Sequence, residues 1–186
     1  VRDLGYKETR PIQSAVIPLA LAGDDLIACA ETGTGKTCAF VVPTLQVLMT
    51  TAPRAAARAQ EAAPAEPPPA APPAAPAARS RVLVLAPTRE LAVQIEDEIH
   101  GLAYHTGVTS AAVYGGVEMG PQERALKAGV DIIVATPGRL IDHMRQQNAD
   151  LGGVELLILD EADRMMDMGF WPDVRRIIAA CPTERQ

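Results

Sequence analysis

The chain has 186 residues, a net charge of −6 and a hydrophobic fraction of 48%. This length suits one domain with a buried core, and the acidic balance excludes a protein that binds nucleic acid through a generally basic surface. No apolar run approaches the ~18 residues of a membrane span, and no signal peptide is visible. Three cysteines without metal-ligand spacing favour reduced thiols and a cytoplasmic protein.

A loop that leads into a helix is predicted at the N-terminus. Pro11 suits the first turn of that helix, and apolar residues recur after it at nearly helical spacing. Gln13 lies in this turn. By itself Gln13 is an exposed polar residue, but its amide also carries the donor and acceptor that match N6 and N7 of adenine.

The next pattern is a phosphate-binding loop between a strand and a helix. The apolar run Leu26–Cys29 predicts a short buried strand, and a helix is predicted from Lys36. Gly33 and Gly35 let backbone N–H groups curl around an anion near the positive end of the helix. Lys36 can reach the nucleotide phosphates, and the Thr37 hydroxyl can bind Mg²⁺. The alternative is a chance Gly/Thr-rich turn, because the strict P-loop pattern begins with glycine and this loop begins with alanine.

The helix from Lys36 is expected to bend or end at Pro43. Residues 51–80 then differ from the rest of the chain, since they hold 8 of its 16 prolines and 14 alanines. This density of proline excludes a stable helix or strand. The segment is predicted to be a disordered, partly polyproline-II surface insert.

Four further apolar runs predict strands, and each is followed by a turn with glycine or polar residues. The runs are 81–86, 111–114, 131–135 and 156–159. Strands that alternate with helices predict an α/β fold, a parallel sheet with helices on both faces. Ligands of such sheets bind beyond the carboxyl ends of the strands, which is where these turns lie.

A helix is predicted after Pro87, with Thr88 as its N-cap. Its inner stripe is expected to be Leu91, Ile95, Ile99 and Leu102, and its solvated face Glu96, Asp97 and Glu98. Residues 122–127 are also predicted to be helical.

Two acidic residues follow the last predicted strand directly. Asp160 is placed as a Walker B carboxylate that holds Mg²⁺, and Glu161 can orient or deprotonate a water. The alternative is a pair of acids that caps a helix. The upstream Lys36 and Thr37 favour the nucleotide site.

Outside residues 51–80, these patterns together resemble the first RecA-like domain of a DEAD-box RNA helicase of superfamily 2. Asp160-Glu161-Ala162-Asp163 is the motif that gives the family its name. The other matches are residues 30–37 to A-x-T-G-x-G-K-T, 87–92 to P-T-R-E-L-A, 115–116 to the GG turn and 136–139 to T-P-G-R. Residues 5–13 resemble the adenine-reading Q motif, although Thr9-Arg10 replace its usual Pro-Thr and Tyr6 replaces a frequent phenylalanine.

The resemblance implies ATP and Mg²⁺ as cofactors. Lys36, Asp160 and Glu161 would be catalytic, with Glu161 as the general base, and Thr37 and Asp160 would hold the metal. The nucleotide would be bound by Tyr6, Gln13, Thr32, Gly33, Thr34, Gly35, Lys36 and Thr37.

RNA is the partner that the resemblance implies, held through its sugar-phosphate backbone and not through its sequence. The residues in contact would be Pro87, Thr88, Arg89, Gly115, Gly116, Thr136, Gly138 and Arg139. Asp163 would couple the ATP site to a second RecA-like domain of the same polypeptide. Residues 1–186 would thus be the N-terminal ATP-binding domain of a longer helicase, nearly inactive as an ATPase by themselves.

Two other functions remain open from the residues. A DNA helicase or another nucleotidase could share the fold, but Gln13 together with Asp160-Glu161-Ala162-Asp163 argues against it. A non-catalytic protein that only clamps RNA or a partner is the second, and the presence of both Lys36 and Glu161 argues against that one.

Overall fold

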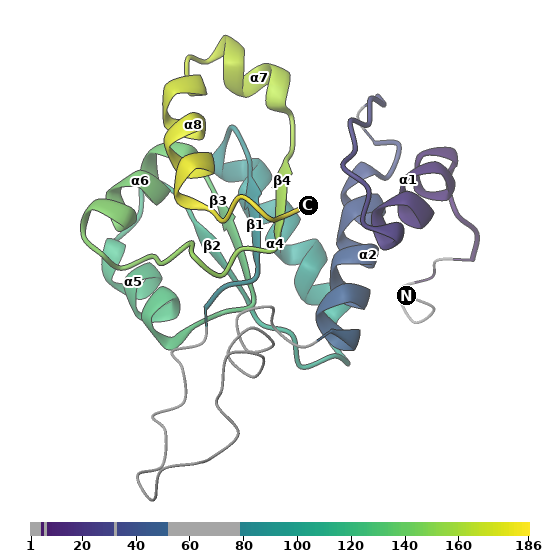
Figure 1. Ribbon diagram of the computed structural model, residues 1–186, viewed down its shortest axis with the longest axis horizontal. Coiled ribbons are helices and arrows are strands. Elements are labelled where there is room, and N and C mark those ends of the chain that lie inside the picture. Colours follow the sequence, from purple (N-terminus) through teal and green to yellow (C-terminus); the bar gives the residue numbers. More distant parts are fainter. Residues whose placement is uncertain (1–4, 6, 32, 52–78) are drawn as a thin grey trace, which may run out of the picture.

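The computed structural model describes residues 5, 7–31, 33–51 and 79–186. In these residues four parallel strands form one sheet in the order β2-β3-β1-β4 (Figure 1). The strands are β1 (Val82–Leu85), β2 (Ser110–Val113), β3 (Ile132–Ala135) and β4 (Leu156–Leu159). Leu83 of β1 pairs with Ile133 on one side and with Leu157 on the other. The predicted parallel sheet is confirmed.

Helices cover both faces of the sheet because alternate residues of a strand point to opposite sides. Val82 and Val84 pack with α2 and α4, whereas Leu83 and Leu85 pack with α6, α7 and α8. The seven described helices are α1 (Pro11–Ala22), α2 (Lys36–Thr50), α4 (Arg89–Ala103), α5 (Met119–Ala128), α6 (Pro137–Arg145), α7 (Ala162–Asp167) and α8 (Trp171–Ala180). None of the helices within the described ranges is long and apolar enough to cross a membrane.

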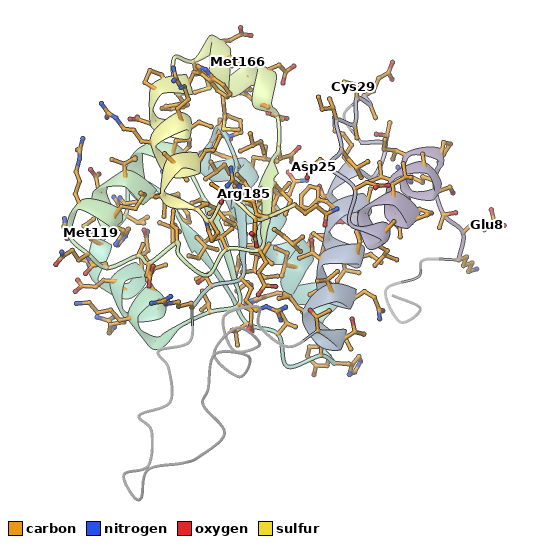
Figure 2. The ribbon with its side chains drawn as sticks, viewed as in Figure 1. Glu8, Asp25, Cys29, Met119, Met166 and Arg185 are labelled. Carbon is orange, nitrogen blue, oxygen red and sulfur yellow. The ribbon has the colours of Figure 1, made fainter. Side chains whose placement is uncertain are left out.

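The strand predicted over Leu26–Cys29 is not present. Residues 24–30 have no regular secondary structure, and Ile27 is 98% exposed. Figure 2 shows Cys29 well away from the sheet, beyond α2. A strand needs a neighbour for its backbone groups, and no described segment pairs with this one. On the outer edge of β4, the backbone N–H of Leu157 donates instead to the carbonyl of Gln186 at 2.9 Å.

The helix that was expected to bend or end at Pro43 does not end there. Helix α2 continues through Pro43 to Thr50. Val41 and Leu45, on either side of the proline, are 1% and 6% exposed and belong to the core under the sheet. Burial of these side chains therefore outweighs the hydrogen bond that proline removes.

The two ends of the predicted insert are held together at its base. The Arg81 guanidinium donates to the Thr51 hydroxyl at 2.7 Å and pairs with the buried carboxylate of Glu155 at 2.8 Å. Residues 52–78 lie outside the described residues, so the disorder assigned to them stays a prediction.

Candidate nucleotide and RNA sites

The loop before α2 has the backbone of an anion cradle. Gly33 and Gly35 adopt left-handed φ values of 78° and 89°. Residues with a side chain rarely adopt this conformation. A Cβ on Gly35 would also lie 2.5 Å from Nε2 of Gln13, so a larger residue here would displace that side chain.

Side chains within the loop fix its shape. The Thr34 hydroxyl donates to the carbonyl of Glu31 at 2.7 Å, and Nζ of Lys36 donates to the carbonyl of Ala30. The ammonium group of Lys36 therefore lies over the loop. A nucleotide phosphate would compete with that carbonyl for it.

Gln13 joins α1 to this loop. Its Oε1 accepts the backbone N–H of Arg10 at 2.9 Å, and its Nε2 donates to the carbonyl of Gly35 at 3.2 Å. The side chain is buried, in contrast to the exposed position considered from the sequence alone. An open cavity of about 560 Å³ lies between α1 and the loop, lined in part by Ile12, Ala15 and Gly33. The contact of Gln13 with adenine stays a prediction, and Tyr6 and Thr32 lie outside the described residues.

Three oxygen-bearing side chains from separate elements meet next to the loop. Thr37 lies in the first turn of α2, Asp160 follows β4, and Glu98 lies on α4. The Thr37 hydroxyl lowers the pKa of Glu98 and the charge of Asp160 raises it, so both groups lie near this carboxylate. Hydroxyl and carboxylate oxygens are the donors that Mg²⁺ prefers, so the chemistry of this set fits that ion.

The carboxyl groups at this point are crowded and partly desolvated. Burial raises the pKa of Asp160, and the charges of Glu161 and Asp163 raise it further, against the backbone N–H of Glu161 and the charge of Lys36. Burial also raises the pKa of Glu98, and its hydrogen bond with Thr37 opposes this. A bound cation would relieve both carboxylates.

Glu161 is held in an unusual backbone conformation. Its φ of 49° and ψ of 47° are left-handed, which costs a residue with a side chain about 1–3 kcal/mol. Its N–H donates to Oδ1 of Asp160 at 3.0 Å, and its carboxylate pairs with Arg164 at 3.1 Å. The side chain of Asp163, in the first turn of α7, is exposed. The turn therefore fixes Glu161 directly beside Asp160.

The two arginines predicted to bind RNA converge on the turn after β2. A Cβ on Gly116 would lie 3.3 Å from Nη1 of Arg89, which comes from the start of α4. Arg139, from the start of α6, donates to the carbonyl of Val117 at 3.0 Å. Two guanidinium groups from separate motifs thus flank one turn, which contains Gly115 and Gly116.

The remaining residues of this edge begin the two helices. Thr88 caps α4, since its hydroxyl accepts the N–H of Leu91 at 3.3 Å. Pro87 is buried at the end of β1, and Thr136 precedes α6, whose first turn contains Gly138. Both helix N-termini open at the carboxyl edge of the sheet, where their partial positive charge favours an anion.

Sequence reasoning missed two residues at these sites. Glu98 was expected to be solvated, and this is wrong, because the side chain is half-buried against Thr37. Its spacing from Leu91, Ile95 and Leu102 could have revealed it, since Glu98 takes a position in the buried stripe. Gln122 is the second: its Oε1 lies 3.4 Å from Nη1 of Arg139. No spacing in the sequence singles out Gln122.

Known proteins are similar to this chain along its whole length. The profile of the family described as DEAD/DEAH box helicase matches residues 10–186. The chain is 45% identical to DEAD-box ATP-dependent RNA helicase 30 of Arabidopsis thaliana, over 100% of this chain and 28% of that protein. It is 40% identical to the ATP-dependent RNA helicase CshA of Listeria monocytogenes, over 100% of this chain and 31% of that one. The chain thus spans less than a third of the length of these two curated relatives.

A solved structure shares the fold as well. The crystal structure of a DEAD box protein from the hyperthermophile Methanococcus jannaschii superposes with a TM-score of 0.81 at 34% identity, over 100% of this chain and 44% of that one. This similarity confirms the predicted RecA-like α/β fold. The family profile covers far more than half of the sequence and includes every motif from the phosphate loop onward. The chain therefore belongs to the DEAD/DEAH box helicase family.

Proposed function

We propose that this chain is the N-terminal, ATP-binding RecA-like domain of an ATP-dependent RNA helicase, which couples ATP hydrolysis to RNA unwinding or to remodelling of RNA–protein complexes. The observation that supports the proposal is the approach of Lys36, which lies over the phosphate loop, to Asp160, whose pKa its charge lowers. These two residues belong to separate nucleotide motifs, and only the fold brings them together. A DNA helicase or a clamp without catalysis would not account for the names of the relatives, which are RNA helicases.

In this proposal the phosphates of ATP lie in the loop at the N-terminus of α2. Lys36 leaves the carbonyl of Ala30 to bind them, and the helix N-terminus adds its partial charge. Thr37 and Asp160 would hold Mg²⁺, which neutralises phosphate charge when bound. Glu161 orients and deprotonates the attacking water. Gln13 and Tyr6 would bind the adenine, and Thr32, Gly33, Thr34 and Gly35 the phosphates.

RNA lies along the other end of the carboxyl edge. Arg89 and Arg139 contact its phosphates on either side of the turn at Gly116, with the N-termini of α4 and α6 beside them. Contacts of this kind set register without reading sequence. This explains how a chain with a net charge of −6 would bind a polyanion. The full set of proposed contacts is Pro87, Thr88, Arg89, Gly115, Gly116, Thr136, Gly138 and Arg139.

A second RecA-like domain of the same polypeptide would complete both sites, with Asp163 coupling the ATP site to it. The relatives are long enough to contain such a domain, since this chain covers 28% of the Arabidopsis protein. No disulfide joins Cys29, Cys38 or Cys181, which fits the cytoplasmic protein that we propose.

The test is phosphate release by the full-length protein with and without RNA. We expect RNA-stimulated hydrolysis that Glu161→Gln lowers by about 10²–10⁴-fold, the usual contribution of a general base, with ATP binding retained. Asp167→Asn, on the exposed side of α7, is the matched control and should behave as wild type. Hydrolysis that DNA stimulates and RNA does not would identify a DNA helicase or another nucleotidase. A wild-type protein that does not hydrolyse ATP would identify a non-catalytic protein that only clamps RNA or a partner.

A further inference from the structure

Gln122 and His143 form a buried polar pair behind the RNA edge. Gln122 lies on α5 and His143 on α6, and the two residues are 7% and 0% exposed. The two helices lie beside each other near β2, at one edge of the sheet (Figure 1). A buried amide and a buried imidazole cost free energy unless hydrogen bonds compensate them. The partners of these two side chains therefore indicate their role.

The Gln122 amide helps to hold the turn of Gly115 and Gly116 from both sides. Its Nε2 donates to the carbonyl of Tyr114, the residue before the glycines, at 3.0 Å. Its Oε1 lies 3.4 Å from Nη1 of Arg139, and Nη2 of the same guanidinium donates to the carbonyl of Val117, the residue after the glycines, at 3.0 Å. The turn, the amide and the guanidinium thus form one closed set of contacts.

His143 fixes the direction in which this amide points. The Nε2 atom of His143 lies 3.3 Å from Oε1 of Gln122, and His143 follows Arg139 by one turn on the same side of α6. An amide oxygen can only accept, so the imidazole has to donate through its Nε2–H. In the reversed amide, the NH₂ group would face two donors, and the oxygen would face the carbonyl of Tyr114. All three contacts therefore favour the same orientation.

The imidazole of His143 is neutral near pH 7. Burial lowers its pKa, and the charge of Arg139 lowers it further, against the charges of Glu123 and Asp142. With its hydrogen on Nε2, the ring carries a lone pair on Nδ1, and this buried atom has no hydrogen-bond partner within the described part of the chain. An apolar side chain would fill this space without the cost of an unsatisfied nitrogen. The histidine is therefore not explained by core packing alone.

We propose that His143 is a positioning residue of the RNA edge, which acts through Gln122. Together the two side chains hold Arg139 and the Gly115-Gly116 turn as one preorganised contact for RNA phosphates. This inference rests on the proposed RNA-binding function. Because the groups are ordered before RNA arrives, less side-chain freedom is lost on binding. Removal of His143 should lower RNA affinity and leave the number of phosphate contacts unchanged.

The experiment measures binding of a fluorescent single-stranded RNA to the full-length protein by anisotropy over a salt series. For His143→Leu we expect affinity to fall about 3-fold, the scale of one neutral hydrogen bond, with no change in the slope of log affinity against log salt. Binding of an ATP analogue with Mg²⁺ should be unchanged. The matched control is His100→Leu, an exposed histidine in the last turn of α4, which should bind RNA as wild type does.

Thermal melts separate positioning from a merely structural role. The melting temperature of His143→Leu should stay the same or rise, because the unsatisfied Nδ1 is removed, while RNA affinity falls. A lower melting temperature together with weaker ATP binding would overturn the proposal in favour of a structural role. His143→Phe keeps an aromatic ring without a donor, so it is the second apolar variant and should match His143→Leu.

A conservative variant and a double-mutant cycle test the action through Gln122. His143→Gln keeps an N–H donor at the same number of bonds from the backbone as Nε2 of histidine, so it should recover most of the lost RNA affinity. In the Gln122→Ala background, His143→Leu should have no further effect on RNA binding. Full additivity of the two changes, or no recovery in His143→Gln, would contradict the proposed path.

The outcomes also separate this inference from the proposed function. If wild type binds RNA and Arg139→Ala weakens that binding, the RNA edge stands. Wild-type RNA affinity in His143→Leu would then overturn the role of His143 alone. If wild type does not bind RNA, or if Arg139→Ala leaves RNA affinity unchanged, the RNA-binding part of the proposed function is wrong.

Discussion

The two proposed sites lie on one edge of the same sheet, yet they are prepared for their ligands in opposite ways. At the RNA edge the cationic groups already have partners around the turn at Gly116: Arg139 donates to the carbonyl of Val117, and Arg89 pairs with Glu90 at 2.6 Å. At the nucleotide site burial raises the pKa values of Glu98 and Asp160, and neighbouring negative charges raise both pKa values further. The acids of the nucleotide site are therefore less fully compensated within the protein than the arginines of the RNA edge, although Glu161 pairs with Arg164.

This difference shows where ligand binding has to reorganise the protein. RNA phosphates can add to arginines that are already in place, so each contact should contribute modestly and independently. ATP with its metal has to displace Lys36 from Ala30 and offset the crowded acids, so single changes there should have larger and coupled effects.

The largest effect is expected for Lys36→Ala. This change removes the cation over the phosphate loop and the positive charge that lowers the pKa of Asp160. A charge-assisted contact of about 1.5–3 kcal/mol corresponds to roughly 10–100-fold weaker binding of ATP with Mg²⁺. Calorimetric titration measures this loss, with Lys127→Ala on α5 as the control. RNA binding without nucleotide should be unchanged, and a loss of RNA affinity would contradict the separation of the two sites.

A smaller effect is expected at the RNA edge. Arg89→Ala and Arg139→Ala should each weaken single-stranded RNA binding about 10-fold for all sequences alike. Each should also reduce the slope of log affinity against log salt by about 0.7, the value for one lost phosphate contact with a single strand. Fluorescence anisotropy over a salt series provides both values. A change confined to one RNA sequence would rule out contacts to the backbone.

A still smaller effect is expected for Gln122→Ala, because this change removes a side chain that supports Arg139 and leaves the charge of Arg139 in place. The Gln122 side chain donates to the carbonyl of Tyr114 at 3.0 Å, and its Oε1 faces Arg139 and the buried ring of His143. We expect RNA affinity to fall about 3-fold, less than for Arg139→Ala, with no change in the salt slope. In the Arg139→Ala background the same change should have no further effect on RNA binding.

How far the sequence could predict these sites depends on how each element is stabilised. The runs that became β1, β3 and β4 were predictable because buried parallel strands are apolar throughout and the turns after them share one edge. The run Leu26–Cys29 has the same composition but no strand beside it, and hydropathy alone cannot show whether a neighbour is present. The glycines of the phosphate loop were predictable from the neighbouring sequence alone, because the left-handed backbone conformation that they adopt is a local property.

Contacts between elements were the part that local rules could not predict. Gln13 contacts Gly35 across 22 positions, and Arg139 contacts Val117 across 22. Such pairs depend on how helices pack, and composition does not encode that packing. Glu98 was partly predictable. Its spacing from the apolar residues of α4 indicated a buried position, whereas its acidic side chain indicated a position exposed to solvent.

The smallest effect, and the one that tests the contrast most directly, concerns the stability of the nucleotide-free protein. Asp160→Asn should raise the melting temperature at pH 7 by about 2 °C. In the folded protein the pKa of Asp160 is raised above its ordinary 3.8, chiefly by burial, so its ionised form opposes folding. An asparagine can still accept the N–H of Glu161 through Oδ1, and it carries no charge.

The raised pKa of Asp160 also determines how the stability of the wild-type protein changes with pH. Between 3.8 and the raised pKa the folded state binds more protons at Asp160 than the unfolded chain, so wild-type stability decreases as the pH rises through this window. The advantage of Asp160→Asn should therefore be complete above the raised pKa and vanish below pH 3.8. Adding ATP with Mg²⁺ should reverse the order, because wild type gains a metal ligand that the variant lacks. Thermal melts at several pH values check both statements. Equal melting temperatures for the two proteins at every pH would mean that the acids are already compensated, and that the nucleotide site is as well prepared as the RNA edge.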